Sequence, residues 1–129
     1  FASLTGAARV ALGTDIAMMF SSDDVIAQDI LDFSKHEQDP IWRMPLFASY
    51  KKQLYSEIAD LKNASDSGYG GAITAALFLQ HFIPKNISWL HFDIMAWNLH
   101  NRDGRPQGGE MVAVRAIFSY LKKKYSVHH

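Results

Sequence analysis

The sequence contains no cysteine, and that absence excludes several kinds of site at once. Disulfide bonds, thiolate metal centres and cysteine nucleophiles all need a residue that these 129 positions do not supply. A chain without cysteine is compatible with the reducing cytoplasm. We therefore expect a cytoplasmic protein whose chemistry uses other side chains.

An excess of charge and long apolar runs are also missing. Thirteen basic residues balance thirteen acidic ones, so the net charge indicates neither a nucleic-acid partner nor attraction to an anionic membrane. The longest apolar runs are too short and interrupted to cross a bilayer, and no basic-then-apolar leader precedes them. We expect a soluble chain whose partners must be inferred from its sites.

The sequence has enough apolar residues for a core. Hydrophobic residues make up 48% of the chain and aromatic residues 12%, and a complete domain of this size buries roughly two-thirds of its unfolded surface. The first residue is Phe1, and "FASLTGAA" looks like the middle of a domain. We therefore expect residues 1–129 to be a fragment of a larger domain.

Apolar periodicity and turn residues predict alternating strands and helices. Strands are expected at 16–22, 42–46 and 87–94, and helices at about 6–12, 23–36, 50–58, 70–83 and 109–124. The last helix would place Met111, Val114, Phe118 and Leu121 on one side. This order predicts an α/β fold with a mostly parallel sheet flanked by helices.

The expected strand 87–94 carries His91 and Asp93 on one face, although its other residues are typical of a buried strand. These two side chains have three possible roles: metal ligands, a catalytic pair, or buried polar groups satisfied by neighbours. Two ligands are too few for a metal site, so the buried pair is favoured.

Three other patterns have a weaker connection with function. Glu57 and Asp60 would lie three apart on a helix, a spacing more typical of a solvated face than of paired catalytic carboxylates. The "GYGG" at 68–71 lacks the lysine and hydroxyl of a phosphate-binding loop, which favours close helix packing instead. His128 and His129 are interpreted as a frayed or engineered tail.

The stretch "SLTGAA" at 3–8 is the strongest candidate from the residues themselves. It passes from a strand end directly into a helix, so the N–H groups around Gly6 are expected at the positive end of the helix dipole. The carbonyls of Ser3 and Leu4 would offer acceptors for an amine or amide N–H. An ordinary strand-to-helix turn remains an equally good interpretation at this point.

The order of five segments carries a family resemblance. They are "SLTGAARVALG", "WRMPL", "SEIADLKN", "GGAITAALFLQHF" and "WLHFDIMAW", spread over nearly the whole chain. In this order and spacing they resemble the C-terminal part of the catalytic domain of the cytosolic leucyl aminopeptidase family. The resemblance implies a metallopeptidase that releases N-terminal amino acids from peptides, with two divalent cations, zinc or manganese, in a hexamer.

The resemblance assigns no metal ligand and no catalytic residue to this chain. The family's "NTDAEGR" motif, which carries carboxylate ligands and an assisting arginine, does not occur in the sequence. Some bacterial relatives bind DNA, but the neutral charge gives that property no support here. The resemblance therefore leaves two hypotheses: a part of a working enzyme, inactive alone, or a truncated non-catalytic domain retained for assembly or binding.

What the resemblance transfers is the peptide-binding side. Ser3, Leu4 and Gly6 match the backbone positions that contact the substrate amine, amide and carbonyl. His91 and Asp93 match buried supports, expected to fix the course of residues 95–98 by hydrogen bonds.

Two further positions are expected in the pocket for the first side chain. Many relatives continue "HFDIAG", whereas this chain has Met95 where they have alanine, and its "DGRPQGGE" departs from the usual threonine-and-glycine run. Met95 and Asn98 are therefore expected to make the pocket shallower and more polar. Alternatively, Met95 turns into the core as a flexible filler beside Trp97.

Overall fold

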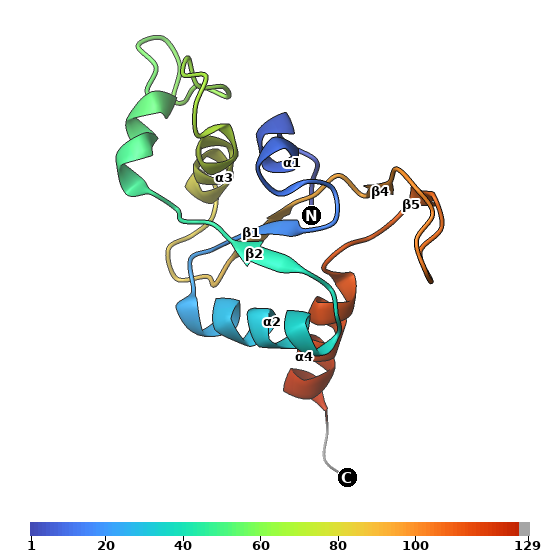
Figure 1. Cartoon of the computed structure of the whole chain (residues 1–129). Coiled ribbons are helices and arrows are strands. Elements are labelled where there is room, and N and C mark those ends of the chain that lie inside the picture. The colour runs from blue at the N-terminus through green and yellow to red at the C-terminus, as the bar shows by residue number, and fades with distance from the viewer. Residues whose placement is uncertain (127–129) are drawn as a thin grey trace.

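A computed structural model describes residues 1–126, and the expected tail at His128 and His129 lies outside them. Its elements in chain order are α1 (Gly6–Leu12), β1 (Ala17–Ser21), α2 (Asp24–His36), β2 (Ile41–Arg43), the 3₁₀ helix η1 (Ala48–Leu54), α3 (Gly71–His81), β3 (Leu90–Asp93), β4 (Trp97–Asn98), β5 (Gly108–Gly109) and α4 (Val114–Tyr125). Figure 1 shows the central strands between two groups of helices. The α/β class predicted from the sequence is confirmed.

The main sheet has the order β2-β1-β3, and its parallel character is only partial. Strand β1 runs parallel to β2 but antiparallel to β3, with Met18 opposite Asp93. The segment that follows α3 lies at the C-terminal end of β1, where the Ser22 N–H donates to the Trp89 carbonyl at 3.2 Å. Strand β3 must therefore run back along β1, which the expectation of a mostly parallel sheet did not foresee.

Strand β1 is buried on both faces, so each face supplies a separate core. Met18 and Phe20 pack with α1 and α3, whereas Ala17 and Met19 pack with α2 and α4. Figure 1 shows these two pairs of helices on opposite sides of the strands. This two-sided burial explains why the sequence around β1 is continuously apolar and does not alternate.

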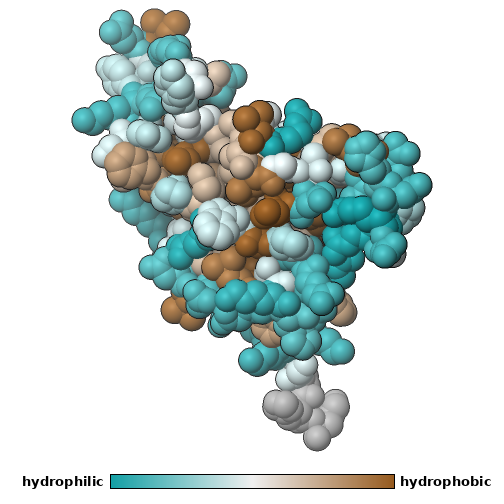
Figure 2. All heavy atoms as spheres, in the orientation of Figure 1, coloured by the Kyte–Doolittle hydropathy of each residue, from teal (hydrophilic) through white to brown (hydrophobic). Residues whose placement is uncertain are grey.

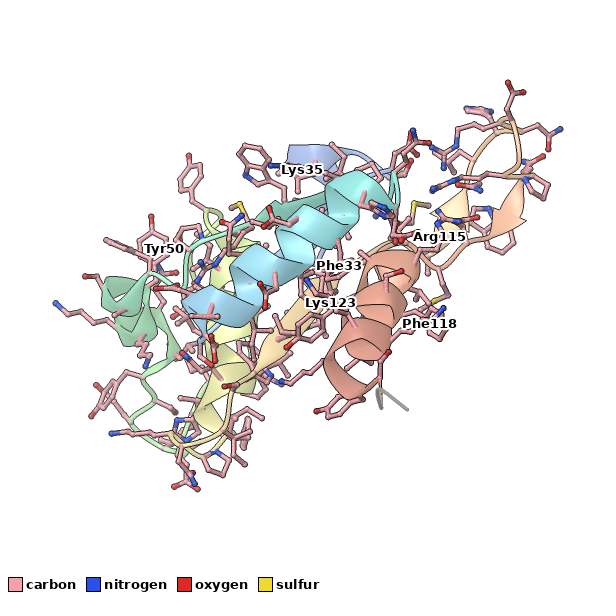
Figure 3. The ribbon with its side chains drawn as sticks, turned by 90° about the horizontal axis from the view of Figure 1, so that it is seen from below. Phe33, Lys35, Tyr50, Arg115, Phe118 and Lys123 are labelled. Carbon is pink, nitrogen blue, oxygen red and sulfur yellow. The ribbon has the colours of Figure 1, made fainter. Side chains whose placement is uncertain are left out.

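Helix α4 begins five residues later than predicted. Gly108 and Gly109 pair with β4, and Ala113 has a left-handed backbone with φ 68°, so the first helical residue is Val114. Met111 therefore lies before the helix, whereas Val114, Phe118 and Leu121 lie on one exposed side of it and the buried face contains Ala116 and Tyr120. Figure 3 shows Phe118 projecting from α4 on the side away from α2.

The predicted helix 50–58 is wrong in its second half. The 3₁₀ helix η1 ends at Leu54, and Ile58, expected on its apolar side, is 99% exposed. The Ser56 hydroxyl accepts the N–H groups of Ile58 and Ala59 at 3.3 and 3.1 Å, a local turn that competes with helix. Glu57 and Asp60 therefore do not share a helix face as paired carboxylates.

Large apolar side chains are exposed in several places, and one of them lies on an edge strand of the sheet. Trp42 lies on β2, which forms one edge of the sheet within residues 1–126, and it is exposed. Figure 2 shows apolar side chains at the surface in the middle of one face. None of the helices described over residues 1–126 combines the length and apolarity needed to cross a membrane.

The glycines before α3 serve close packing, as the sequence favoured. Gly70 has a left-handed backbone with φ 67°, and a Cβ added there would lie 2.9 Å from Cε2 of Tyr50. A Cβ on Gly71 would meet Ala7 at 3.5 Å. These contacts hold α3 against η1 and α1.

We expect Gly70→Ala to lower the free energy of unfolding by about 2 kcal/mol, because a left-handed alanine is strained and its methyl group overlaps the Tyr50 ring. Urea-induced unfolding of both proteins measures this difference. Gly68→Ala is the matched control, since no atom lies within 4 Å of its added Cβ. Equal losses in the two variants would contradict the packing role of Gly70.

Candidate functional site

The candidate site forms where the N-terminal segment meets the end of β3. The Ala2 N–H donates to the Phe92 carbonyl, and the Ile94 N–H donates to the Ala2 carbonyl, both at 3.0 Å. The Ser3 hydroxyl also donates to the Ile94 carbonyl. Residues 2–3 therefore lie beside β3 before the chain turns into α1.

The buried carboxylate of Asp93 fixes the turn between that segment and α1. Asp93 is 2% exposed, and its Oδ1 accepts the Leu4 N–H at 3.1 Å. Its Oδ2 accepts the Thr5 hydroxyl at 2.8 Å, and Thr5 Oγ1 in turn accepts the Ala8 N–H at 3.1 Å as the N-cap of α1. Asp93 thus supports residues 4–5. The sequence had predicted that it would support residues 95–98.

This turn determines which backbone groups remain available. The Leu4 N–H is already bonded to Asp93, so Leu4 can present only its carbonyl. Gly6 is the first residue of α1, a position whose N–H has no partner within its own helix. The arrangement therefore combines carbonyl acceptors from Ser3 and Leu4 with an N–H donor from Gly6.

A cavity of about 290 Å³ adjoins the turn. Its lining includes Ser3, Leu4, Gly6 and Met95, four of the residues singled out from the sequence. Asp93 and Arg9 also line the cavity. A Cβ added to Gly6 would lie 3.9 Å from the Arg9 guanidinium, so the two residues are close together. The structure therefore brings a hydrogen-bonding backbone, one cation and one flexible apolar side chain to the same hollow.

Asn98, which was expected to line the pocket for the first side chain, is not among the residues that line this cavity. Its side chain is 3% exposed, and its Nδ2 donates to the Pro106 carbonyl at 3.1 Å and to Glu110 at 3.4 Å. Its Oδ1 accepts Arg102 at 2.5 Å. Because both ends of the amide are engaged, Asn98 supports the β4-β5 hairpin and does not make the cavity more polar.

His91 is buried in an aromatic stack outside the cavity lining. It is 3% exposed, and its ring lies nearly parallel to those of Phe20 and Trp89, with centroids 6.0 Å from each. Its Nε2 has no hydrogen-bond partner within residues 1–126. Burial lowers the pKa of His91 below 6.5, although the nearby Asp93 carboxylate partly opposes that shift. The ring is therefore held neutral at neutral pH.

This neutral histidine predicts an acid-sensitive fold. Since the pKa of His91 is lower in the folded state, the unfolded chain binds more protons just below pH 6.5. The free energy of unfolding should therefore fall as the pH is lowered from about 6.5 toward the folded pKa. His91→Phe should remove this dependence of the free energy of unfolding on pH, while an aromatic ring keeps the contacts with Phe20 and Trp89. His100→Gln is the control, because His100 is exposed and its replacement should leave the dependence unchanged. Urea-induced unfolding of the three proteins at several pH values measures the difference.

The part of the chain that the structure describes offers no cluster of metal-ligating side chains. Within residues 1–126, no three His, Asp or Glu side chains lie close enough to hold a cation. His91 and Asp93 therefore remain a pair without a third ligand. The available side chains do not fit a two-metal site.

Sequence reasoning missed the importance of Thr5 and Arg9. Thr5 directly precedes a helix, which is a recognisable capping position. Arg9 is three residues beyond Gly6 on α1, and that spacing returns its side chain to the same face. The partnership of Thr5 with Asp93 had no local signal, because 88 positions separate them.

Comparison with known proteins gives one consistent result. The model of the cytosol aminopeptidase family, catalytic domain, matches residues 1–118. Probable cytosol aminopeptidases of Chlamydia abortus and Prochlorococcus marinus subsp. pastoris are 43% and 42% identical, and each match covers 95% of this chain but 25% of the relative. The chain therefore spans about a quarter of the length of these relatives.

Solved structures agree. A crystal structure of the cytosol aminopeptidase from Coxiella burnetii matches with a TM-score of 0.90 and 54% identity, over 95% of this chain and 27% of that one. The bottromycin maturation enzyme BotP in complex with Mn matches with a TM-score of 0.89 and 37% identity, over 96% of this chain and 28% of that one.

Proposed function

Because the chain belongs to the cytosol aminopeptidase family, we propose that it is the C-terminal portion of the catalytic domain of an aminopeptidase. The intact protein would release N-terminal amino acids from peptides in the cytoplasm. The observation that carries this proposal is the cavity at the 3–6 turn, which Ser3, Leu4 and Gly6 line together with Met95.

The role of this segment would be to hold the peptide. The carbonyls of Ser3 and Leu4 would accept hydrogen bonds from the substrate amine and amide, and the Gly6 N–H would donate to a peptide carbonyl. Rigid placement of such groups lowers the entropic cost of reaching the reactive geometry. Asp93 would act indirectly, because it fixes the turn that presents them.

The family implies two divalent cations, zinc or manganese, in the intact protein. Residues 1–126 offer no cluster of ligands, so we assign none to this chain. We expect the 129 residues alone to bind these cations weakly and to hydrolyse no aminoacyl substrate. Assembly as a homo-hexamer is likewise proposed for the intact protein.

The proposal can be tested by exchanging the matching segment of the Coxiella burnetii aminopeptidase for this chain. We expect the exchanged enzyme to assemble like the parent and to hydrolyse leucyl substrates within about tenfold of its kcat/KM, because 54% identity preserves the backbone contacts. A folded, assembled but inactive exchange would contradict the proposal. It would favour the alternative, a non-catalytic domain retained for assembly or binding.

Met95 should limit the depth of the pocket for the first side chain. We expect Met95→Ala to raise kcat/KM for leucyl and phenylalanyl substrates relative to alanyl ones by roughly 10- to 200-fold, because a longer side chain would then fit. Steady-state kinetics with the three substrates measures the ratios. A uniform change on all three would show that Met95 does not shape the pocket.

A further inference from the structure

The β4-β5 hairpin lies directly after the cavity-lining Met95 and carries a polar loop. Trp97 and Asn98 pair with Gly109 and Gly108, and the loop between them closes through a bridge of Arg102 with Arg105. Figure 1 shows the hairpin extending beyond the end of the sheet, and the corresponding part of Figure 2 is mostly hydrophilic. Met95 therefore lies in the short segment 94–96 that joins β3 to this hairpin.

Arg102 joins the hairpin to a second segment of the cavity wall. Its Nη2 donates to Asn98 Oδ1 at 2.5 Å, and its Nη1 lies 3.0 Å from Asp15 Oδ2. Asp15 belongs to the turn between α1 and β1, in which Gly13 and Ile16 line the cavity. The Arg102 guanidinium therefore connects the hairpin, which follows Met95, with the turn 13–16 between α1 and β1.

The base of the hairpin is held without Arg102. Glu110 lies 3.6 Å from both Arg105 and Arg115, and its N–H donates to the Ala96 carbonyl at 3.1 Å. Ala96 itself has a left-handed backbone with φ 58°. Loss of Arg102 should therefore leave the strands of the hairpin paired, but it should loosen Asn98 and the adjoining residues 94–97 relative to the turn at Asp15.

We propose that Arg102 is a positioning residue for substrate preference, which acts by joining Asn98 to Asp15 and thereby fixing Met95 relative to Gly13 and Ile16 in the cavity. The proposal rests on the aminopeptidase function for its kinetic consequence. Its structural part, the link between Asn98 and Asp15 through Arg102, stands on the contacts alone, and the restraint on residues 94–97 is inferred from that link. Arg102 itself is not among the cavity-lining residues and would touch no substrate.

The test uses Arg102→Gln, Asp15→Asn and their combination in the segment-exchanged aminopeptidase. Each should change the leucyl-to-alanyl ratio of kcat/KM by roughly three- to fivefold, the effect of one partly exposed ion pair. The double variant should equal Arg102→Gln alone, because Asp15→Asn removes only a contact that Arg102→Gln has already removed. Arg102→Lys, which keeps a cation toward Asp15, should retain most of the original ratio.

Arg43→Gln is the matched control, since Arg43 pairs with Asp24 and lines no part of the cavity. It should leave the ratio unchanged. Hydrogen exchange of the amides at 94–97 provides a readout that needs no activity and should accelerate only in the Arg102 and Asp15 variants. Unchanged exchange, additive effects or an equal change in the control would overturn the proposal, whereas an inactive exchange enzyme would count against the function alone.

Discussion

Replacing Asp39 with alanine is expected to lower the free energy of unfolding by about 3 kcal/mol, through the loss of buried hydrogen bonds and a charge partner. Asp39 is completely buried and accepts the N–H groups of Ala113 at 2.9 Å and Ala116 at 3.2 Å. Arg115 lies 3.8 Å from the same carboxylate. Asp39 thus caps α4, whose own N-cap residue has no side chain to do so.

Urea-induced unfolding followed by circular dichroism measures this loss in the protein that carries the chain. Asp32→Ala is the matched control, because Asp32 is exposed on α2 and bonds only to Gln28 within residues 1–126. The control should change the free energy by less than about 0.5 kcal/mol. A similar small loss for Asp39→Ala would show that α4 does not depend on this cap.

The second large effect is expected from Asp93→Ala, on activity as well as stability. The variant leaves the Leu4 N–H and the Thr5 hydroxyl without their buried acceptor, so the 3–6 turn should lose its fixed course. A misplacement of about 1 Å at a substrate-binding group can cost on the order of 100-fold in rate. We expect kcat/KM of the segment-exchanged aminopeptidase to fall by that order.

Asp93→Asn separates hydrogen bonding from charge. Its amide oxygen can still accept the Leu4 N–H, and its NH₂ group can donate to Thr5 Oγ1, so most of the turn should persist. We therefore expect a loss of less than about tenfold for Asn, well below that for Ala. Equal, small losses in both variants would mean that the turn is held by the neighbouring strand contacts instead.

Local features of the fold were predictable because their causes are local. The start of α2 follows from its N-cap Asp23, and the end of α1 follows from Gly13, a glycine with a positive φ. Two helix boundaries were predicted wrongly, because a turn or a hairpin formed where the apolar spacing predicted helix. Ser56 ended the expected helix through its own turn, and Gly108 with Gly109 joined a hairpin instead of α4.

The candidate site was predictable only in part. The turn of Ser3, Leu4 and Gly6 was found from its strand-to-helix pattern and the family resemblance, and the structure places Met95 beside it. Asn98 does not line the cavity, and its position three residues beyond Met95 says nothing about which partners its amide meets. Those partners, Arg102, Pro106 and Glu110, come from the returning half of the hairpin.

The sequence by itself determined the α/β class, most helix boundaries and the family of this chain, since periodicity, caps and ordered motifs are all read along the backbone. Tertiary structure alone decided that β3 runs antiparallel to β1. It also decided the partners of two buried carboxylates: Asp39 bonds to Ala113, 74 positions away, and Asp93 to Leu4, 89 positions away. The physical reason is that a buried carboxylate must bond to whichever donors the packing brings near, and no local pattern names them.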